Sequence, residues 1–285
     1  MTVLEVIQRS AEFLQNKGVE SPRLQIELML GQVLNVPRLK LYLNFDRALT
    51  EAELTRLREM VKRRGAREPL QHILGTTSFC GLEIKCSRAA LIPRPETELL
   101  AERAWQLLAE RPDQALTVLD LGTGTGCIAI AVAAHAPKAR LHLVDVSPEA
   151  LAGARENAAL NRCMDRFEFH QGDGFTALPA GLRFDLILSN PPYIASEEIA
   201  SLSPEVRDFD PRLALDGGGD GLDFYRRIAR EAGAWLEPQG KLMLEFGDGQ
   251  VPALEKIFSD EKWIVEEIVS DYSPRPRILI ARPAP

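Results

Sequence analysis

Residues 1–65 carry apolar side chains at the three- and four-residue spacing of amphipathic helices. Residues 2–5 and 50–53 have the Thr-x-x-Glu spacing of a capping box, which marks a helix start. Gly18 and Gly65 follow as helix stops, and Ser21-Pro22 has the order of an N-cap and a first helical residue. The pattern predicts a small helical domain over residues 1–68.

The pattern changes at residue 69. Residues 70–74 and 78–86 have the character of short strands, the second folded into a hairpin around Gly81. Pro93 and Pro95 exclude a helix over residues 91–98. We therefore expect residues 69–95 to form a connector with a β-hairpin, followed by a second domain over residues 96–285.

Helical and extended patterns alternate through this second domain. Strands alternating with helices predict an α/β fold with a mostly parallel sheet covered on both faces. The last two expected strands have no helix between them, so they predict an antiparallel hairpin at one edge. The expected helices are 97–109, 127–134, 148–161, 222–236 and 251–258, and the expected strands are 117–121, 140–146, 167–170, 184–189, 241–246, 263–269 and 277–281.

Composition is that of a globular protein, with 45% hydrophobic and 26% charged residues in a chain of 285. Residues 127–134 form the longest apolar run, far short of the roughly 20 residues that a membrane span needs. The amino-terminal residues have no unbroken apolar core, so we expect no secretory signal. The four cysteines form no CxxC pair and have no ligand spacing to the histidines. This favours reduced thiols, no metal site and a cytoplasmic location.

Charge is unevenly distributed along the chain. Residues 1–90 hold 14 basic and 10 acidic side chains, a net charge of +4, whereas the remainder carries −11. An acidic chain binds naked nucleic acid poorly by electrostatics alone. Residues 56–67 are the one basic stretch; they favour a solvated helix face, with contact to an acidic or phosphate-rich partner as the alternative.

A glycine-rich turn follows the strand expected at 117–121. Glycine lets the backbone approach a ligand closely, and N–H groups at the start of the next helix favour an anionic group. Asp145 ends the following strand, where a carboxylate can accept both hydroxyls of a ribose. We expect a nucleoside-bearing cofactor here, with a merely structural turn as the alternative. The spacing differs from the dinucleotide fingerprint, which argues against NAD. The turn consists of Gly122, Thr123, Gly124, Thr125 and Gly126.

A second motif, Asn190-Pro191-Pro192-Tyr193, follows the strand expected at 184–189. Ligands of an open α/β sheet bind beyond the carboxyl ends of its strands, so Asn190 is placed to meet one. The side-chain oxygen of Asn190 and the carbonyl of Pro191 can accept both hydrogens of one planar NH2, with the Tyr193 ring beside it. Such acceptors orient a weakly nucleophilic nitrogen and stabilise the charge that grows as it attacks a methyl group. A rigid turn without chemistry is the alternative.

Together these motifs resemble class I S-adenosylmethionine-dependent methyltransferases that act on amide or exocyclic amino nitrogens. Residues 67–75, 79–81, 91–98 and 216–222 narrow the resemblance to the release factor glutamine methyltransferases. The resemblance implies a Rossmann-like catalytic domain over residues 96–285 and S-adenosylmethionine as methyl donor. It also implies N5-methylation of the glutamine in the Gly-Gly-Gln motif of class I peptide release factors, with the helical domain docking the substrate protein.

The same resemblance implies a role for each site residue. The glycine turn would bind the methionine end of the cofactor and Asp145 its ribose. Asn190 would contact the cofactor and, with the residues up to Tyr193, hold the glutamine amide. Asp173, Gly174 and Phe175 would lie beside the adenine. Family members commonly carry an aromatic residue directly after this aspartate, so we expect Phe175 to replace it or the adenine to pack less tightly.

Other functions stay open at this point. A close relative could methylate a ribosomal-protein glutamine or the amino group of a nucleobase, although the acidic second domain counts against nucleic acid. A protein that binds the cofactor without catalysing a reaction is an alternative from another functional class. The presence of both Asn190 and Asp145 argues against it. We expect a monomer whose partners are class I release factors, without membrane contact or a stable complex with nucleic acid.

Overall fold

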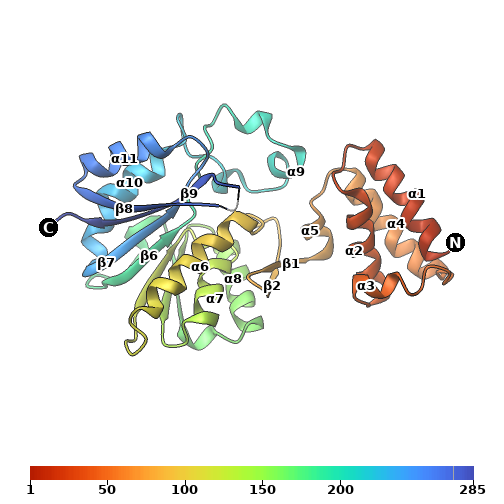
Figure 1. Ribbon diagram of the computed structural model, residues 1–285, viewed down its shortest axis with the longest axis horizontal. Helices are drawn as coiled ribbons and strands as arrows, with labels where there is room; N and C mark the ends of the chain where they lie inside the picture. Colours follow the sequence, from red (N-terminus) through yellow and green to blue (C-terminus); the bar gives the residue numbers. More distant parts are fainter. Residues whose placement is uncertain (272) are drawn as a thin grey trace. The chain divides into compact units, whose positions relative to one another are not determined.

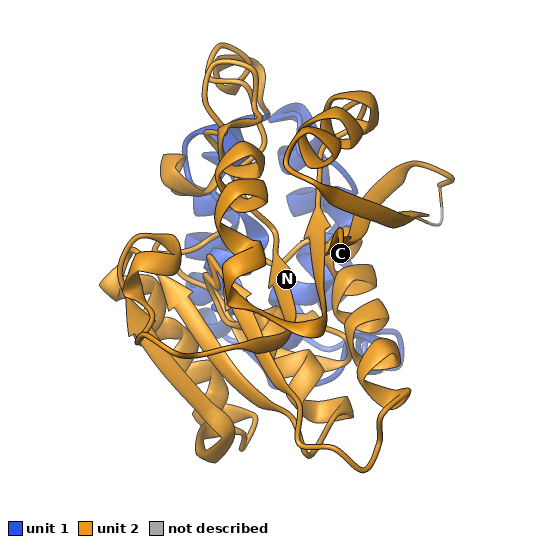
Figure 2. Cartoon of the chain, turned by 90° about the vertical axis from the view of Figure 1, so that its left-hand side faces the viewer, with its two compact units in different colours: residues 1–76, 203–209 blue, residues 77–202, 210–285 orange. Residues whose placement is uncertain are grey.

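The chain divides into two compact units in the computed structural model, which describes residues 1–271 and 273–285. The helical unit comprises residues 1–76 and 203–209, and the sheet unit comprises residues 77–202 and 210–285 (Figure 2). The segment 69–95, expected as a connector, is therefore divided between the two. No helix of the described residues is long and apolar enough to cross a bilayer.

The helical unit is built around the apolar faces of its three longest helices. Its elements are α1 (Val3–Asn16), α2 (Pro22–Leu34), α3 (Arg38–Leu41), α4 (Glu51–Gly65), α5 (Leu70–Leu74) and α9 (Pro204–Arg207). Both predicted capping boxes are present, at the starts of α1 and α4. Ser21 is left-handed and its side chain makes no capping hydrogen bond, so the start of α2 depends on Pro22 at its first position.

Residues 70–74 are helical, so the prediction of a strand there is wrong. Pro69 has the fixed φ that suits the residue before a helix, and Gly75 ends the helix in a left-handed conformation. Leu70, Ile73 and Leu74 recur at helical spacing and pack on the core of the helical unit. A short apolar run between a proline and a glycine fits either element, and here the helical period prevails.

The sheet unit contains a seven-stranded sheet in the order β5-β4-β3-β6-β7-β9-β8. The first five are parallel, and β9 is antiparallel to both β7 and β8, which confirms the predicted sheet. Its strands are β3 (Thr117–Leu121), β4 (Arg140–Asp145), β5 (Phe167–Gln171), β6 (Phe184–Ser189), β7 (Leu236–Glu245), β8 (Trp263–Ser270) and β9 (Pro276–Pro283). The expected hairpin forms a separate small sheet of β1 (Thr76–Phe79) and β2 (Leu82–Lys85).

Helices cover both faces of the large sheet (Figure 1). Alternate strand residues face opposite ways: Val118 packs into the cluster beneath α6 to α8, and Leu119 into the cluster beneath α10 and α11. The helices are α6 (Pro95–Ala109), α7 (Cys127–His135), α8 (Pro148–Leu160), α10 (Asp223–Glu231) and α11 (Val251–Asp260), with 3₁₀ turns at Met164–Arg166, Gly174–Ala177, Ile199–Ser201, Arg212–Ala214 and Ala232–Trp235.

Several boundaries differ from expectation, among them the start of β7, which lies at Leu236 and not at residue 241. The helix α6 begins at Pro95, because proline suits the first helical position even though it cannot sit in a helix interior. The α-helix expected over 222–236 ends at Glu231, and the next four residues form a 3₁₀ turn. Since β4, β3 and β6 are adjacent and parallel, their carboxyl ends meet at one edge of the sheet.

Candidate active site

A cavity of about 820 Å³ opens at this edge of the sheet unit. Its wall combines the glycine turn after β3, the loops after β4, β5 and β6, residues 88–94 ahead of α6, and part of α10. Its volume is that of a site for a small organic ligand. It is lined by every predicted site residue except Gly126 and Tyr193.

The glycine turn is fixed by hydrogen bonds to the neighbouring strand. The N–H of Gly122 donates to the carbonyl of Val144 at 2.9 Å, and that of Gly124 donates to Oδ2 of Asp145 at 2.8 Å. The N–H of Ser147 donates to the other carboxylate oxygen of Asp145 at 2.9 Å. A carboxylate oxygen accepts more than one hydrogen bond, so Asp145 is held in place and still able to accept from ligand hydroxyls.

Asp120 supports the glycine turn from the interior of the protein. It is fully buried, and the hydroxyl of Thr123 donates to its Oδ2 at 2.6 Å. Burial raises the pKa of Asp120 to about 6, although the hydrogen bond from Thr123 opposes the rise. Gly126 takes a left-handed conformation ahead of α7, and a Cβ there would lie 3.2 Å from the Cβ of Ala154. Gly126 therefore serves the packing of α7 against α8 and does not line the cavity.

Asn190, Pro191 and Pro192 line the cavity from the end of β6. The Nδ2 of Asn190 donates to the hydroxyl oxygen of Thr97 at 3.1 Å, which orients the amide and leaves its oxygen as the acceptor. Tyr193 lies elsewhere. It packs against the core beneath α10 and α11, where burial raises its pKa to about 12, and its carbonyl accepts from Gln250 at 3.0 Å.

The loop after β5 forms the far end of the cavity. Phe175 lines it but is only 3% exposed and stacks on Trp235, with ring centroids 6.0 Å apart. Arg227 of α10 pairs with the carboxylate of Asp173 and donates to its carbonyl. A Cβ at Gly174 would lie 2.8 Å from Nη2 of Arg227, so the missing side chain makes room for this guanidinium.

Comparison with known proteins identifies the family. The release factor glutamine methyltransferase of Geobacter sulfurreducens is 45% identical over 258 residues, which cover 90% of this chain and 88% of that protein. The chain belongs to the release factor glutamine methyltransferase family. A further member, from Cereibacter sphaeroides, is 40% identical over 282 residues and 99% of both chains.

Two family models match different parts of this family member. The model described as "PrmC N-terminal domain" matches residues 5–75, and the one described as "Methyltransferase small domain" matches residues 98–203. A solved methyltransferase from Pyrococcus furiosus has a TM-score of 0.52 at 18% identity, covering 72% of this chain and 90% of that one. That likeness shows a shared fold. The enzyme is a methyltransferase whose helical amino-terminal domain matches the amino-terminal domain of its family.

Sequence reasoning missed two residues near the Asn-Pro-Pro-Tyr motif and the cavity, Thr97 and Arg227. It placed a third, Glu245, at the end of a strand, where lining the pocket and a solvated position were equally expected. Thr97 is the third residue of α6, Glu245 ends β7, and Arg227 lies in the middle of α10. Glu245 is 2% exposed, and its Oε2 has no hydrogen-bond partner among the described residues. Burial raises the pKa of Glu245 to about 7. Hydrogen bonds with Thr97 and Asn190 lower this pKa, but burial prevails. A buried carboxyl group therefore supports the amide that faces the cavity.

Proposed function

We propose that this enzyme transfers the methyl group of S-adenosylmethionine to N5 of the glutamine in the Gly-Gly-Gln motif of class I peptide release factors, in the cytoplasm. The observation that carries the proposal is the placement of Asn190 and the glycine turn on one cavity, with the Asn190 amide oriented by Thr97. Family membership supports the substrate.

The cofactor side of the cavity suits a sulfonium nucleoside. When bound, S-adenosylmethionine supplies an electrophilic methyl carbon on a positively charged sulfur. Asp145 is placed to accept from the ribose hydroxyls, and the open space beside Gly122, where no atom lies within 4 Å of a Cβ position, suits the methionine end. The guanidinium of Arg227, beside Gly174, is placed to lie against the adenine ring in the place of an aromatic side chain.

The target side of the cavity orients an amide nitrogen. The Oδ1 of Asn190 and the carbonyl of Pro191 accept the two N–H bonds of the glutamine side chain, which directs the nitrogen lone pair towards the methyl carbon. Bound S-adenosylmethionine would supply the methyl carbon and would keep the electron pair of its C–S bond as a neutral thioether, so Asn190 and Pro191 have only to hold and orient the nitrogen. The positive charge on nitrogen is stabilised by the two acceptors until one of its protons leaves to solvent.

The proposal is tested by methyl transfer from labelled S-adenosylmethionine. Separate reactions contain an unmethylated class I release factor, its Gly-Gly-Gln→Gly-Gly-Ala variant, ribosomal proteins, or duplex DNA. We expect label in the unaltered release factor alone. Label in ribosomal protein or DNA would contradict the substrate, and no label with cofactor still bound would favour a silent cofactor-binding module.

A further inference from the structure

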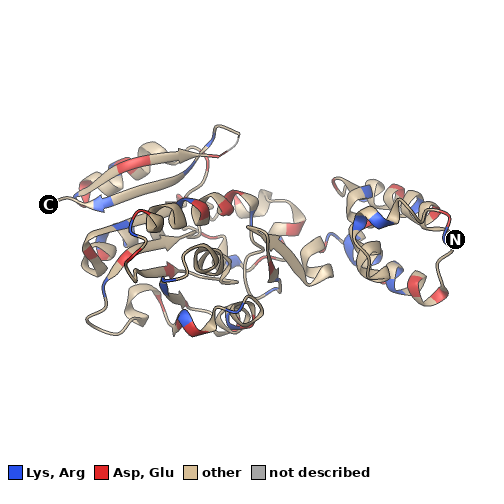
Figure 3. Cartoon of the chain, turned by 60° about the horizontal axis from the view of Figure 1, so that its bottom comes forward, with Lys and Arg blue, Asp and Glu red and all other residues tan. Residues whose placement is uncertain are grey.

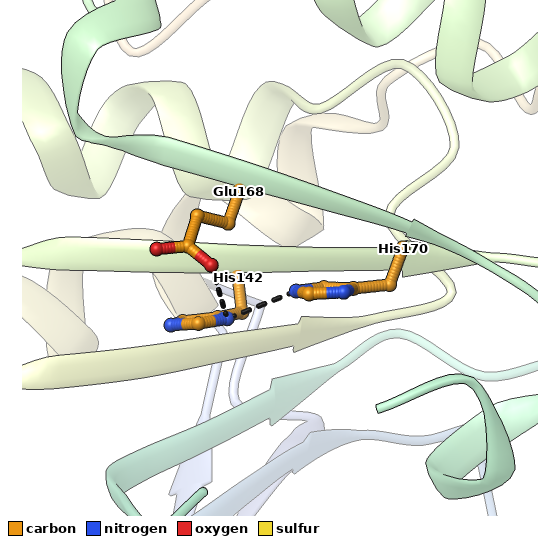
Figure 4. Close-up of side chains that lie close together, drawn as sticks. All are labelled: His142, Glu168 and His170. Carbon is orange, nitrogen blue, oxygen red and sulfur yellow. Dashed lines mark hydrogen bonds and ion pairs between the residues drawn. The ribbon is translucent and has the colours of Figure 1, made fainter. Parts of the chain in front are cut away.

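Two histidines and a glutamate converge on the sheet away from the cavity described above. His142 lies on β4, and Glu168 and His170 lie on β5, the strand at the edge of the sheet. His142 is the register partner of Glu168, and His170 follows on the same side of β5 two residues later. The three side chains point towards one another (Figure 4).

Their possible ligand atoms are close together. The Nδ1 of His142 lies 2.9 Å from the Nε2 of His170 and 3.8 Å from the Oε2 of Glu168, and all such atoms lie within 4.8 Å of one another. In tetrahedral zinc sites, Zn–N distances of about 2.0–2.1 Å place ligand nitrogens about 3.3 Å apart. The two rings would separate by a few tenths of an ångström, and the exposed Glu168 side chain would close by about as much.

We infer that His142, Glu168 and His170 form a binding site for a first-row transition-metal ion of the zinc type. Two imidazoles and one carboxylate are a ligand set that such ions accept, with water completing the coordination on the exposed side of Glu168.

The surroundings of the cluster suit this role. Burial lowers the pKa of both His142 and His170, which keeps the rings in the neutral form that binds metal. The His142 ring is fixed edge-on against Phe184, at a centroid distance of 5.3 Å. The planes of the two imidazoles are nearly parallel, with an interplanar angle of 5°. Bound metal would join the edge strand β5 to β4 through side chains as well as through the backbone ladder.

The sequence shows no sign of this cluster, because the 25 residues between His142 and Glu168 include a helix and a 3₁₀ turn. Only the register between β4 and β5 brings the ligands together. This site is separate from the cavity proposed for methyl transfer, so the inference of a metal site does not depend on the proposed function.

The test is a Zn²⁺ titration of the full chain, freed of any affinity tag, against a chromophoric chelator at pH 7.5. We expect one ion per chain, and at least a tenfold loss of affinity in His170→Gln and in Glu168→Gln. Both positions are more accessible than His142, whose replacement risks the fold. His135→Gln is the matched control, since His135 stacks on Trp105 and lies outside the cluster; its affinity for zinc should equal that of the parent.

A second readout identifies the atoms. Zinc should shift the ¹⁵N resonances of Nδ1 in His142 and Nε2 in His170, and leave those of His135 unchanged. Absence of stoichiometric binding would overturn the inference, as would binding that neither variant weakens. Zinc held by the cysteines would give that last result.

Discussion

At the scale of single residues, the site depends on partners that lie far apart in the sequence. Asn190 was predicted because the two prolines beside it form part of the same chemical motif. Thr97, which holds the Asn190 amide, lies 93 positions earlier and carries no local signature. The same applies to Arg227, whereas Glu245 could be placed only as far as the end of an expected strand. A hydrogen-bond partner supplied by another element becomes visible only when the elements have packed.

Replacement of Glu245 by glutamine should stabilise the protein at alkaline pH. Because the folded state raises the pKa of Glu245 from 4.5 to about 7, its stabilising contribution is complete below pH 4.5 and is lost as pH rises through 7. The glutamine variant escapes this loss, so its free energy of unfolding should exceed that of the parent above pH 8, by on the order of 3 kcal/mol. Urea unfolding between pH 5 and 8.5 measures the difference. A difference that is constant with pH would show that ionisation of Glu245 does not destabilise the folded state.

Replacement of Arg227 by alanine should weaken binding of S-adenosylmethionine three- to tenfold. The reason is loss of the guanidinium beside Gly174, worth roughly 1 kcal/mol as a stacking contact. Arg230→Ala, an exposed position of the same helix, is the control. Calorimetric titration would count against this role of Arg227 if both variants bound the cofactor equally well.

At the scale of elements, the strand–turn–helix units were predictable because apolar periodicity and cap residues agree with one another. The sheet order and the antiparallel β9 follow from such local patterns together with packing of both faces. The prediction for residues 70–74 was wrong because the segment between Pro69 and Gly75 has only five residues. A segment that short fits a strand and a single helical turn almost equally well. Short elements depend on what they pack against, here the core of the helical unit.

Two glycines of one turn should respond differently to alanine. Both have positive φ, which costs an alanine about 1 kcal/mol. At Gly126 the added methyl also lies 3.2 Å from Ala154, so Gly126→Ala should lower the free energy of unfolding by about 2–3 kcal/mol. At Gly122 the methyl meets no atom within 4 Å and enters the cavity wall, so Gly122→Ala should chiefly lower cofactor affinity. Urea unfolding and cofactor titration of both variants measure this; the reverse pattern would refute the assignment of Gly126 to packing.

At the scale of the whole molecule, the chain returns to the helical unit after the Asn-Pro-Pro-Tyr motif. Residues 203–209 belong to that unit, where Glu205 accepts from Arg64 and Arg67. The basic stretch that the sequence presents as a charged face is thus largely paired, and acidic positions accompany basic ones on these helices (Figure 3). No sequence pattern predicts that residues 203–209 pack with the helical unit, because the contacting residues lie about 140 positions apart in the sequence.

Removal of the Glu205 charge should destabilise the helical unit. Burial opposes ionisation of Glu205, but hydrogen bonds from Arg67 and Arg64 prevail and lower its pKa to about 2. Its contribution is therefore present above pH 4.5 and is lost as pH falls towards 2. Glu205→Gln should cost about 3 kcal/mol at pH 7, because it leaves the charge of the buried Arg64 without its carboxylate partner. The exposed Asp208→Asn is the control, and an equal, small effect of both on urea unfolding would contradict the role of Glu205.

In the proposed mechanism, the Asn190 amide oxygen activates the nitrogen that receives the methyl group. Its most direct test is the single-turnover rate of methyl transfer to a class I release factor by the parent enzyme and by Asn190→Ala, with cofactor affinity measured alongside. We expect a rate at least about 100-fold lower in the variant, with a much smaller change in affinity for S-adenosylmethionine. An unchanged rate, or a slower rate explained entirely by lost cofactor binding, would contradict it.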